Sequence, residues 1–468
     1  MVTTKEIVSN MQSNINKLVD YINKIKENTD KDTYYCLSCI YGAFLGDAMG
    51  AYCEFQKSDI SNISQIFNGN PRLGDDPGQV TDDSEMAIAS AFALMDNPEM
   101  ENLNSDYLYY YYGLWHLSRP KDEGNTIRNS LKDFNPNYFN PDKENNYSQN
   151  YEKIRKKNSN SLANGFLMRT SPLIVWLYYR FKEKIINTFH KKNNSFELLE
   201  LFIIVHKQVM KDNICTHPNS SLSIAHSIYC IMALGAICDL MPNDIIDNII
   251  KLISNNYFKS EEIVSITKMI MEEILFYKKN KQLSEFKNSY NYFTSGNRDV
   301  NNQMGYYFHA FRLTLYYLYF FNEIKGKKNT TRYREIMNQI CAFGGDTDTN
   351  ASIVGTVIGP LIGFRNFGQN EFQIMIRLVP KNRFVFSPGL MILYVHYLKM
   401  NINNQEKRKI FLIMILNMML EKIDVNNLDQ VFSVNKSVKK INNNFINNYG
   451  NKYNTINNYE YNKNIWYK

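Results

Sequence analysis

The chain has 468 residues, of which 44% are hydrophobic and 14% aromatic, so it can bury a sizeable core and is not a disordered protein. Its formal net charge is +7, but residues 436–468 hold six Lys and one Glu and therefore carry +5 of that total. The remaining body is close to neutral. A nearly neutral body does not support the broad basic surface with which a protein binds the phosphate backbone of a nucleic acid.

The first predicted element is an amphipathic helix within residues 5–27, in an N-terminal region that we place at 1–33. Its apolar side chains recur at three- and four-residue steps among polar ones; they are Ile7, Met11, Ile15, Leu18, Ile22 and Ile25. This period is typical of a helix with one apolar face. The helix either packs on the body of the protein or serves for association, and the pattern fits both.

The body of the chain, residues 34–430, has a helical apolar period almost throughout and no convincing alternating strand. The expected helices lie at 86–95, 107–117, 172–182, 196–210, 222–240, 260–277, 306–322, 350–363 and 408–423. Residues 120–160 differ, because they are rich in Asn, Asp, Lys and Tyr and contain three prolines. They predict a long loop inserted in the domain, ordered in part as a lid. We therefore predict an all-α fold with one large helical domain.

The end of the chain, residues 431–468, is a low-complexity tail. Its last 33 residues contain eleven Asn and five Tyr, and they have little aliphatic content to pack. We predict that this tail is disordered.

The compartment is suggested by two features. No charged-then-apolar signal region and no window of 18 uninterrupted apolar residues occur, so neither secretion nor a membrane span is expected. Seven cysteines form an odd, sparse set, which fits reduced thiols in a cytoplasmic protein and leaves a nuclear location open. Cys36 and Cys39 have CxxC spacing, but no second pair at metal-ligand spacing follows, so we interpret them as small apolar residues of a helix.

Three short segments break the helical pattern in the same way: a Gly-rich turn, clustered acids and hydroxyls, then a helix of small residues. They are 42–50 (GAFLGDAMG) followed by Glu54, 78–86 (GQVTDDSEM) and 344–351 (GGDTDTNA). One such motif is an ordinary helix cap. Capping needs only one acid per helix, whereas the second and third segments supply two each. Because adjacent acids repel one another, a compensating cation is the better explanation.

The candidate ligands are all oxygen donors; they are Thr81, Asp82, Asp83, Asp346, Asp348 and Thr349. Hard oxygen ligands favour Mg²⁺ or Mn²⁺ over zinc. Two octahedral ions would need about twelve ligands, more than these side chains supply unless carboxylates bridge. Water and substrate hydroxyls would fill the other positions, which is the arrangement of a catalytic site.

In this order and at this spacing, the three segments resemble the ADP-ribosylglycohydrolase family, which includes the hydrolase that reactivates ADP-ribosylated dinitrogenase reductase. Residues 164–173 (NGFLMRTSPL) are similar to the family's Gly-Asn-Gly-x-x-Met-Arg-x-x-Pro segment, and 216–218 (THP) precede a small-residue helix, also as in the family. The resemblance covers about residues 34–400. It implies an all-α fold with a binuclear Mg²⁺ centre at the bottom of a cleft that binds ADP-ribose.

Position by position, the resemblance implies that the six oxygen donors above bind two Mg²⁺ ions, with Mn²⁺ as a second candidate. It assigns catalytic roles to Glu54, Asp83 and Asp346, where Glu54 is the acid on a mobile segment near the metals. It assigns the ADP-ribose cleft to Asn164, Gly165 and His217.

Three of these positions leave alternatives open. Asp47 matches the family's Gly-Asp pair and serves either as a structural cap or in a metal-linked role. His217 either contacts the ribose or phosphate region or packs at a helix start. Arg169 is either a phosphate clamp or one half of a buried ion pair.

Two departures from the family pattern concern the adenine end of the cleft. Gly-Asn-Gly reads Ala163-Asn164-Gly165 here, and Leu162 stands where several relatives carry an aromatic residue that stacks on adenine. Loss of that aromatic residue would either weaken the stacking on adenine or move it to another ring, for which the candidates are Tyr138, Tyr147, Tyr151 and Phe166.

The function that the resemblance implies is Mg²⁺-dependent hydrolysis of the glycosidic bond between ADP-ribose and an acceptor. The partners would be ADP-ribose conjugates, above all ADP-ribosylated protein. The alternatives are a catalytically inactive family member that only binds ADP-ribose, and a helical interaction protein with an incidental cation site. The acceptor linkage (arginine, serine, O-acyl or polymer) and the oligomeric state are left open by the sequence.

Overall fold

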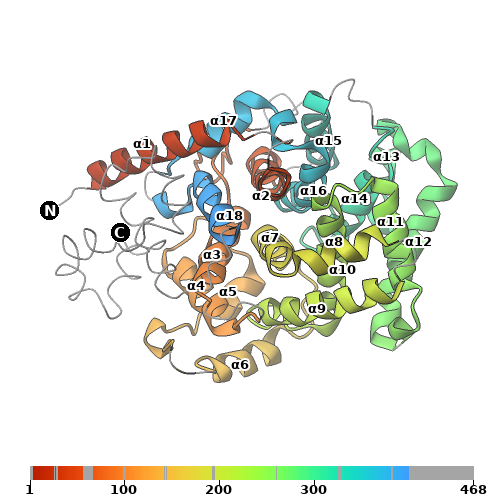
Figure 1. The fold of residues 1–468 in the computed structure, drawn as a ribbon, viewed down its shortest axis with the longest axis horizontal. Coiled ribbons are helices and arrows are strands. Elements are labelled where there is room, and N and C mark those ends of the chain that lie inside the picture. The colour runs from red at the N-terminus through yellow and green to blue at the C-terminus, as the bar shows by residue number, and fades with distance from the viewer. Residues whose placement is uncertain are drawn as a thin grey trace.

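The structure, a computed structural model, describes residues 4–399 with gaps at 26, 28–29, 56–66, 98–101, 142, 144, 192–194, 260, 325–328 and 381–382. Over these described residues the regular secondary structure consists of eighteen α-helices and short 3₁₀ turns. The β pairing among them is one isolated antiparallel bridge between Ala163 and Tyr306. The predicted all-α fold is confirmed (Figure 1).

The helices of the first half are α1 (Thr4–Ile22), α2 (Lys31–Gly50), α3 (Asp82–Asp96), α4 (Ser105–Leu117), α5 (Asn125–Leu131), α6 (Ser148–Asn158), α7 (Ser171–Arg180), α8 (Lys182–His190) and α9 (Ser195–Asn213). Those of the second half are α10 (Ser220–Ile237), α11 (Pro242–Ile253), α12 (Glu261–Lys279), α13 (Phe286–Phe293), α14 (Tyr307–Tyr319), α15 (Asn329–Phe343), α16 (Thr347–Ile362), α17 (Gln369–Arg377) and α18 (Met391–Lys399). Each helix predicted before residue 400 is present. The one expected at 408–423 and the tail lie outside the described residues.

The N-terminal helix α1 packs on the body, which is the first of the two alternatives left open by its sequence. Of its predicted apolar face, Met11, Ile15, Leu18 and Ile22 are buried. Figure 1 shows α1 lying along α17, and the side-chain amide of Gln12 donates a 2.7 Å hydrogen bond to the carbonyl of Arg377 at the end of α17. The apolar face of α1 is therefore part of the core.

The central pair of helices, α2 and α16, touch backbone to backbone (Figure 1). Glycines recur at every fourth position of α2, which places them on one face of the helix. A Cβ added at Gly46 would lie 2.3 Å from the carbonyl oxygen of Ala351, and one at Gly42 would lie 2.3 Å from that of Gly355. Only glycine allows this approach, and it brings Asp47 on α2 beside the beginning of α16.

The prediction of a long loop at 120–160 is wrong for most of that stretch. It contains α5, a 3₁₀ turn at Pro136–Tyr138 and α6. The apolar period is weak because both helices are short and much of the buried surface is aromatic. Tyr147, for example, is fully buried with its ring centroid 4.8 Å from that of Tyr109 on α4. The stretch is therefore packed structure attached to α4.

Two helical stretches, Lys31–Cys53 and Ser220–Ile237, are long and apolar enough to cross a membrane by length and composition alone. Within the protein, 94% and 89% of these stretches are buried, as expected of central core helices. Both cysteines of the CxxC pair, Cys36 and Cys39, are free thiols buried on α2. This confirms their interpretation as core residues.

Candidate functional site

The three acid-bearing segments meet at the N-terminal ends of α3 and α16. Asp82 and Asp83 open α3, Asp346 caps α16 and Asp348 lies in its first turn. Glu54 follows α2 after the 3₁₀ turn η1 (Ala51–Cys53). Helix N-termini carry partial positive charge, so they are favourable places for acids, but two helix ends cannot compensate this many carboxylates.

The carboxylates form two triads that share one member. One oxygen from each of Asp47, Asp83 and Asp348 lies within 4.8 Å of the others, and the same holds for Glu54, Asp346 and Asp348. All five side chains are buried. Oxygen atoms at this spacing can converge on a small divalent cation, which binds carboxylates at about 2.0–2.6 Å. Asp82 is half-buried and belongs to neither triad.

The hydroxyl groups predicted as ligands lie inside this cluster. Thr81 Oγ1 is 2.8 Å from Asp47 Oδ1, 3.2 Å from Asp83 Oδ2 and 3.3 Å from Asp348 Oδ2, although its single hydrogen can serve only one of them. Thr349 Oγ1 is 3.3 Å from Asp83 Oδ2. Acceptors therefore outnumber donors.

The clearest sign of a missing partner is Asp83 Oδ1, which is buried and has no hydrogen-bond partner among the residues that the structure describes. A buried carboxylate oxygen without a partner is costly. A cation would satisfy it, and the donor set of carboxylates and hydroxyls suits a hard ion such as Mg²⁺. The residues present therefore fit metal ions at the two triads.

Electrostatics support the same interpretation. Burial, followed by repulsion from Asp346 and Asp122, raises the pKa of Glu54 to about 8. Burial and the neighbouring acids also raise the pKa of Asp83 and that of Asp348 well above the usual range for a carboxyl group. Without a cation, repulsion between these carboxylates and their burial favour the protonated forms.

Asp47 has the structural contacts that one of its two alternatives predicted. Its carboxylate accepts hydrogen bonds from the backbone N–H groups of Thr81 at 3.0 Å and Ser84 at 3.1 Å, and so caps α3 from the neighbouring helix α2. Burial raises the pKa of Asp47 to about 6, against the lowering effect of these hydrogen bonds. Since one of its oxygens also belongs to the first triad, Asp47 links the helix packing to the acid cluster.

Asn164 lies against the acid cluster. Its side-chain amide donates a 2.7 Å hydrogen bond to Asp346 Oδ2, and its backbone N–H donates to Gly305 at 2.8 Å, next to the β-bridge. Gly165 follows under tight packing, since a Cβ there would lie 3.0 Å from Ile127 and 3.2 Å from the ring of His217. The three residues predicted to line the cleft thus lie close to one another, and Asn164 is the one that contacts an acid of the cluster.

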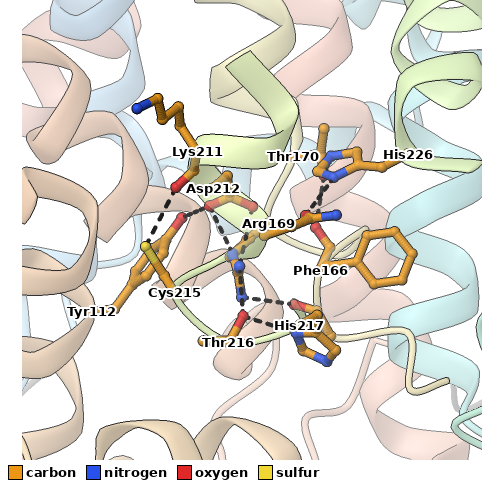
Figure 2. A network of polar contacts seen from close by, with 12 residues as sticks. Tyr112, Phe166, Arg169, Thr170, Lys211, Asp212, Cys215, Thr216, His217 and His226 are labelled. Atoms are coloured by element: carbon orange, nitrogen blue, oxygen red, sulfur yellow. Dashed lines mark hydrogen bonds and ion pairs between the residues drawn. The ribbon is translucent and has the colours of Figure 1, made fainter. Parts of the chain in front are cut away.

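Arg169 forms a buried ion pair, which decides between its two alternatives (Figure 2). Its Nη2 and Nε donate to the two carboxylate oxygens of Asp212 at 3.1 and 3.3 Å. The same guanidinium donates to Thr216 Oγ1 at 2.8 Å and to the carbonyl of Gly165 at 3.1 Å. Arg169 is therefore no phosphate clamp; it fixes the two backbone segments that carry Asn164 and His217.

His226 and His217 border this network, and they differ in whether both ring nitrogens have a hydrogen-bond partner. His226 has both ring nitrogens within 2.9 Å of oxygens, those of Thr170 and Asn213, and burial lowers its pKa to about 3. His217 is also buried, and burial and Arg169 lower its pKa, so it too is neutral at pH 7. Its Nδ1 lies 2.8 Å from Thr216 Oγ1, whereas its Nε2 has no partner in the structure. His217 is thus the one with a polar atom available to a ligand.

The aromatic residues named for adenine stacking are mostly unavailable. Tyr147, Tyr151 and Phe166 are buried in the core, where Phe166 lies 5.6 Å from the ring of His217. The prediction is wrong for these three rings. They fill space in the core beside α4 and α10, so they are not available to stack on adenine. Tyr138 is exposed, and so is Leu162.

Sequence reasoning missed three polar residues near Glu54. Asp122, between α4 and α5, raises the pKa of Glu54, Asp82 and Asp346 by its charge. The other two, Asn70 and Arg72, donate hydrogen bonds to the carboxylate of Glu54. None of the three belongs to a motif, and only the fold brings them to this place.

Comparisons with known proteins agree with these observations. A model of the ADP-ribosylglycohydrolase family matches residues 30–370. The chain is 27% identical over 339 residues to a protein of Acanthamoeba polyphaga mimivirus, provisionally designated an ADP-ribosyl glycohydrolase, covering 69% of this chain and 86% of that protein. It is 34% identical over 100 residues to the ADP-ribosyl-dinitrogen reductase glycohydrolase of Rhodospirillum rubrum, covering 20% of this chain and 33% of that enzyme. A solved structure of an ADP-ribosylglycohydrolase-related protein complex aligns at 14% identity with a TM-score of 0.42, covering 76% of this chain and 99% of the other.

Proposed function

The chain belongs to the ADP-ribosylglycohydrolase family, and on this premise we propose that it is a Mg²⁺-dependent hydrolase that cleaves the glycosidic bond between ADP-ribose and an acceptor. The observation that carries the proposal is the pair of buried acidic triads joined at Asp348, in which Asp83 Oδ1 lacks a partner. Such a cluster destabilises a protein unless it binds cations, and perturbed acids of this kind are typical of catalytic sites.

The residues that would hold two Mg²⁺ ions, with Mn²⁺ as the other candidate, are Thr81, Asp82, Asp83, Asp346, Asp348 and Thr349. Of these, Asp83, Asp346 and Asp348 belong to the triads, whereas Asp82 lies outside both. When bound, the ions supply Lewis-acid chemistry at the distal ribose of the substrate. Asn164 would couple substrate and metal sites, because its amide already contacts Asp346. The neutral ring of His217 offers its Nε2 as a hydrogen-bond partner for a ribose or phosphate group.

Glu54 would handle the proton of the reaction, at the leaving group or at the attacking water. It is buried and close to Asp346 and Asp348, and in the metal-free protein burial raises its pKa above the ordinary value of a carboxyl group. A catalytic acid or base works best when its pKa lies near the working pH. The ordinary glycosidase arrangement of one acid and one nucleophilic carboxylate is not what this cluster resembles.

The test is a panel of defined conjugates: peptides ADP-ribosylated on arginine or serine, O-acetyl-ADP-ribose and poly(ADP-ribose). We expect at least one to release free ADP-ribose with Mg²⁺ and none to do so with a chelator. Full turnover in the chelator would contradict the metal-dependent proposal. If ADP-ribose with Mg²⁺ raises the melting temperature but no conjugate is cleaved, the chain is an inactive ADP-ribose-binding member of the family.

A further inference from the structure

The carboxylate of Glu54 is held from outside the acid cluster. The side-chain amide of Asn70 donates a hydrogen bond to Glu54 Oε2 at 2.6 Å, and Nη2 of Arg72 donates to the same oxygen at 2.9 Å. Both donors belong to the described segment 67–80 that precedes α3. Because they share one carboxylate oxygen, Oε1 is left free of this pair of contacts.

Arg72 also contacts the residue that follows Glu54. Its guanidinium lies 4.9 Å from the centre of the Phe55 ring. Phe55 has a φ of +52°, a left-handed conformation that a bulky side chain rarely adopts. The backbone N–H of Phe55 donates a 3.0 Å hydrogen bond to the carbonyl of Gly345, the neighbour of Asp346. The strained turn after Glu54 is thus tied on one side to Arg72 and on the other to Gly345, next to Asp346 of the acid cluster.

The charges around Glu54 show why it needs such support. Asp346 and Asp122 face it with negative charge, and Arg72 is the positive charge that opposes them. A glutamate side chain among acids would reduce the repulsion by turning away from them. A charge-assisted hydrogen bond, stronger than a neutral one, opposes that movement.

We propose that Asn70 and Arg72 are positioning residues of the reaction. They act as a clamp that holds the Glu54 carboxylate towards Asp346 and Asp348, so that it faces the substrate in the productive orientation. The clamp rests on the proposed function and deepens it, because it assigns the orientation of Glu54 to two residues that do not touch the substrate.

The experiment compares the full-length protein with Arg72→Ala, Arg72→Lys and Asn70→Ala. The control is Arg334→Ala, which removes an arginine of similar exposure, 45% against 49%, from its ion pair with Glu371 outside the acid cluster. For each variant, kcat and KM are measured on the conjugate that the wild type cleaves. The melting-temperature rise with ADP-ribose and Mg²⁺ reports whether the cleft is intact.

A third readout needs no activity. Cys53 directly precedes Glu54 and is only 7% exposed, so its labelling by N-ethylmaleimide, located by peptide mass spectrometry, reports the opening of this segment. Arg72 is half-exposed, so Arg72→Ala should fold even if Asn70→Ala, which removes a buried side chain, does not.

For Arg72→Ala we expect kcat to fall by about 10- to 100-fold, because misplacing a catalytic group by about 1 Å costs that much. KM and the effect of ADP-ribose should stay close to wild type, Cys53 should be labelled several-fold faster, and Arg72→Lys should recover part of kcat. The control should match the wild type throughout.

Other results would overturn the clamp. Wild-type kcat and wild-type labelling in Arg72→Ala would contradict it, and a higher KM at unchanged kcat would mean that Arg72 contacts the substrate itself. If the wild type cleaves no conjugate, the proposed function fails, and the labelling rate alone then decides whether Asn70 and Arg72 hold this segment.

Discussion

Two buried polar clusters lie on either side of residues 164–165 and are built in opposite ways. In one, Arg169 pairs with Asp212 and also binds Gly165 and Thr216 (Figure 2). In the other, the neighbouring Asn164 contacts Asp346, one of five buried carboxylates in the two triads. The first cluster compensates its charges within the chain, whereas the second leaves an excess of negative charge.

The difference between the two clusters separates buried charges that are paired within the chain from buried charges that need a partner. A buried ion pair offsets the desolvation of its charges by their attraction and hydrogen bonds, and the loss of one partner leaves a buried charge that strongly destabilises the fold. Buried acids whose repulsion and burial are not fully compensated have a raised pKa, as Glu54, Asp83 and Asp348 do. The contacts of the Arg169 cluster are therefore those of a structural ion pair, whereas the acid cluster has the composition of a site that could hold metal ions.

The largest expected effect comes from removing charge from the acid cluster. Replacing Asp83 and Asp346 together by Asn, or by Ala, should lower turnover by roughly 1,000-fold or more, because interactions of the transition state are lost at two places. In a chelator the Asn variant should be at least as stable as the wild type, since repulsion decreases. Product release and melting temperature measure both effects.

The control for that variant is Asp244→Asn, at an exposed acid on α11, which should change neither quantity. A marked loss of stability of the double Asn variant in the chelator would contradict the contrast between the two clusters. It would mean that the acids support the fold as the Arg169 pair does.

The next effect concerns the compensated cluster. Arg169→Met leaves Asp212 as a buried, unpaired acid and should cost about 3–5 kcal/mol of unfolding free energy, measured by urea denaturation. The matched exposed change Arg334→Met should cost about 0–1 kcal/mol. If Arg169→Met retains wild-type stability and weakens ADP-ribose binding instead, Arg169 belongs to the cleft after all.

A smaller loss of stability is expected when a substitution disturbs the contact between α2 and α16, which places the acids. Gly46→Ala inserts a methyl group 2.3 Å from the carbonyl oxygen of Ala351, so α2 and α16 must move apart. Overpacking of this kind costs about 1–3 kcal/mol. Because Asp47 lies next to Gly46 in α2, Mg²⁺ should also stabilise the variant less than the wild type.

The matched control is Gly124→Ala, where an added Cβ meets nothing within 4 Å and φ is −60°. It should leave thermal and urea unfolding unchanged. Equal effects of the two substitutions would show that the close contact of α2 and α16 has no special role in placing the acids.

The last prediction is a pH dependence of opposite sign to that of ordinary acids. The folded pKa of Glu54, about 8, lies above its unfolded value, so between about pH 5 and 8 the folded state holds a proton that the unfolded state has released. The metal-free protein should therefore lose stability as the pH rises through this range, by about 1.4 kcal/mol per pH unit and about 4 kcal/mol in all from Glu54. Saturating Mg²⁺ should remove the loss. Rising stability of the metal-free protein over the same range would be inconsistent with uncompensated acids.

The sequence by itself determined the features that depend on neighbours along the chain. Apolar periods identified the helices, because one helical face repeats every three to four residues. The density of acids and hydroxyls at 81–83 and 346–349 identified the candidate ligands, because a helix start needs only one cap. The same local reasoning failed at 120–160, where the two short helices bury few aliphatic side chains and the residues between them bury aromatic rings.

Only the tertiary structure decided which of several chemically equal roles a residue has. Arg169 could equally have bound phosphate until Asp212, 43 positions away, was found against it. The four rings named for adenine could not be ranked until three proved to be core. Asn70, Arg72 and Asp122 carry no motif, and their importance comes from lying next to Glu54. A contact between distant segments leaves no period or spacing in the sequence, so it is visible only once the chain is folded.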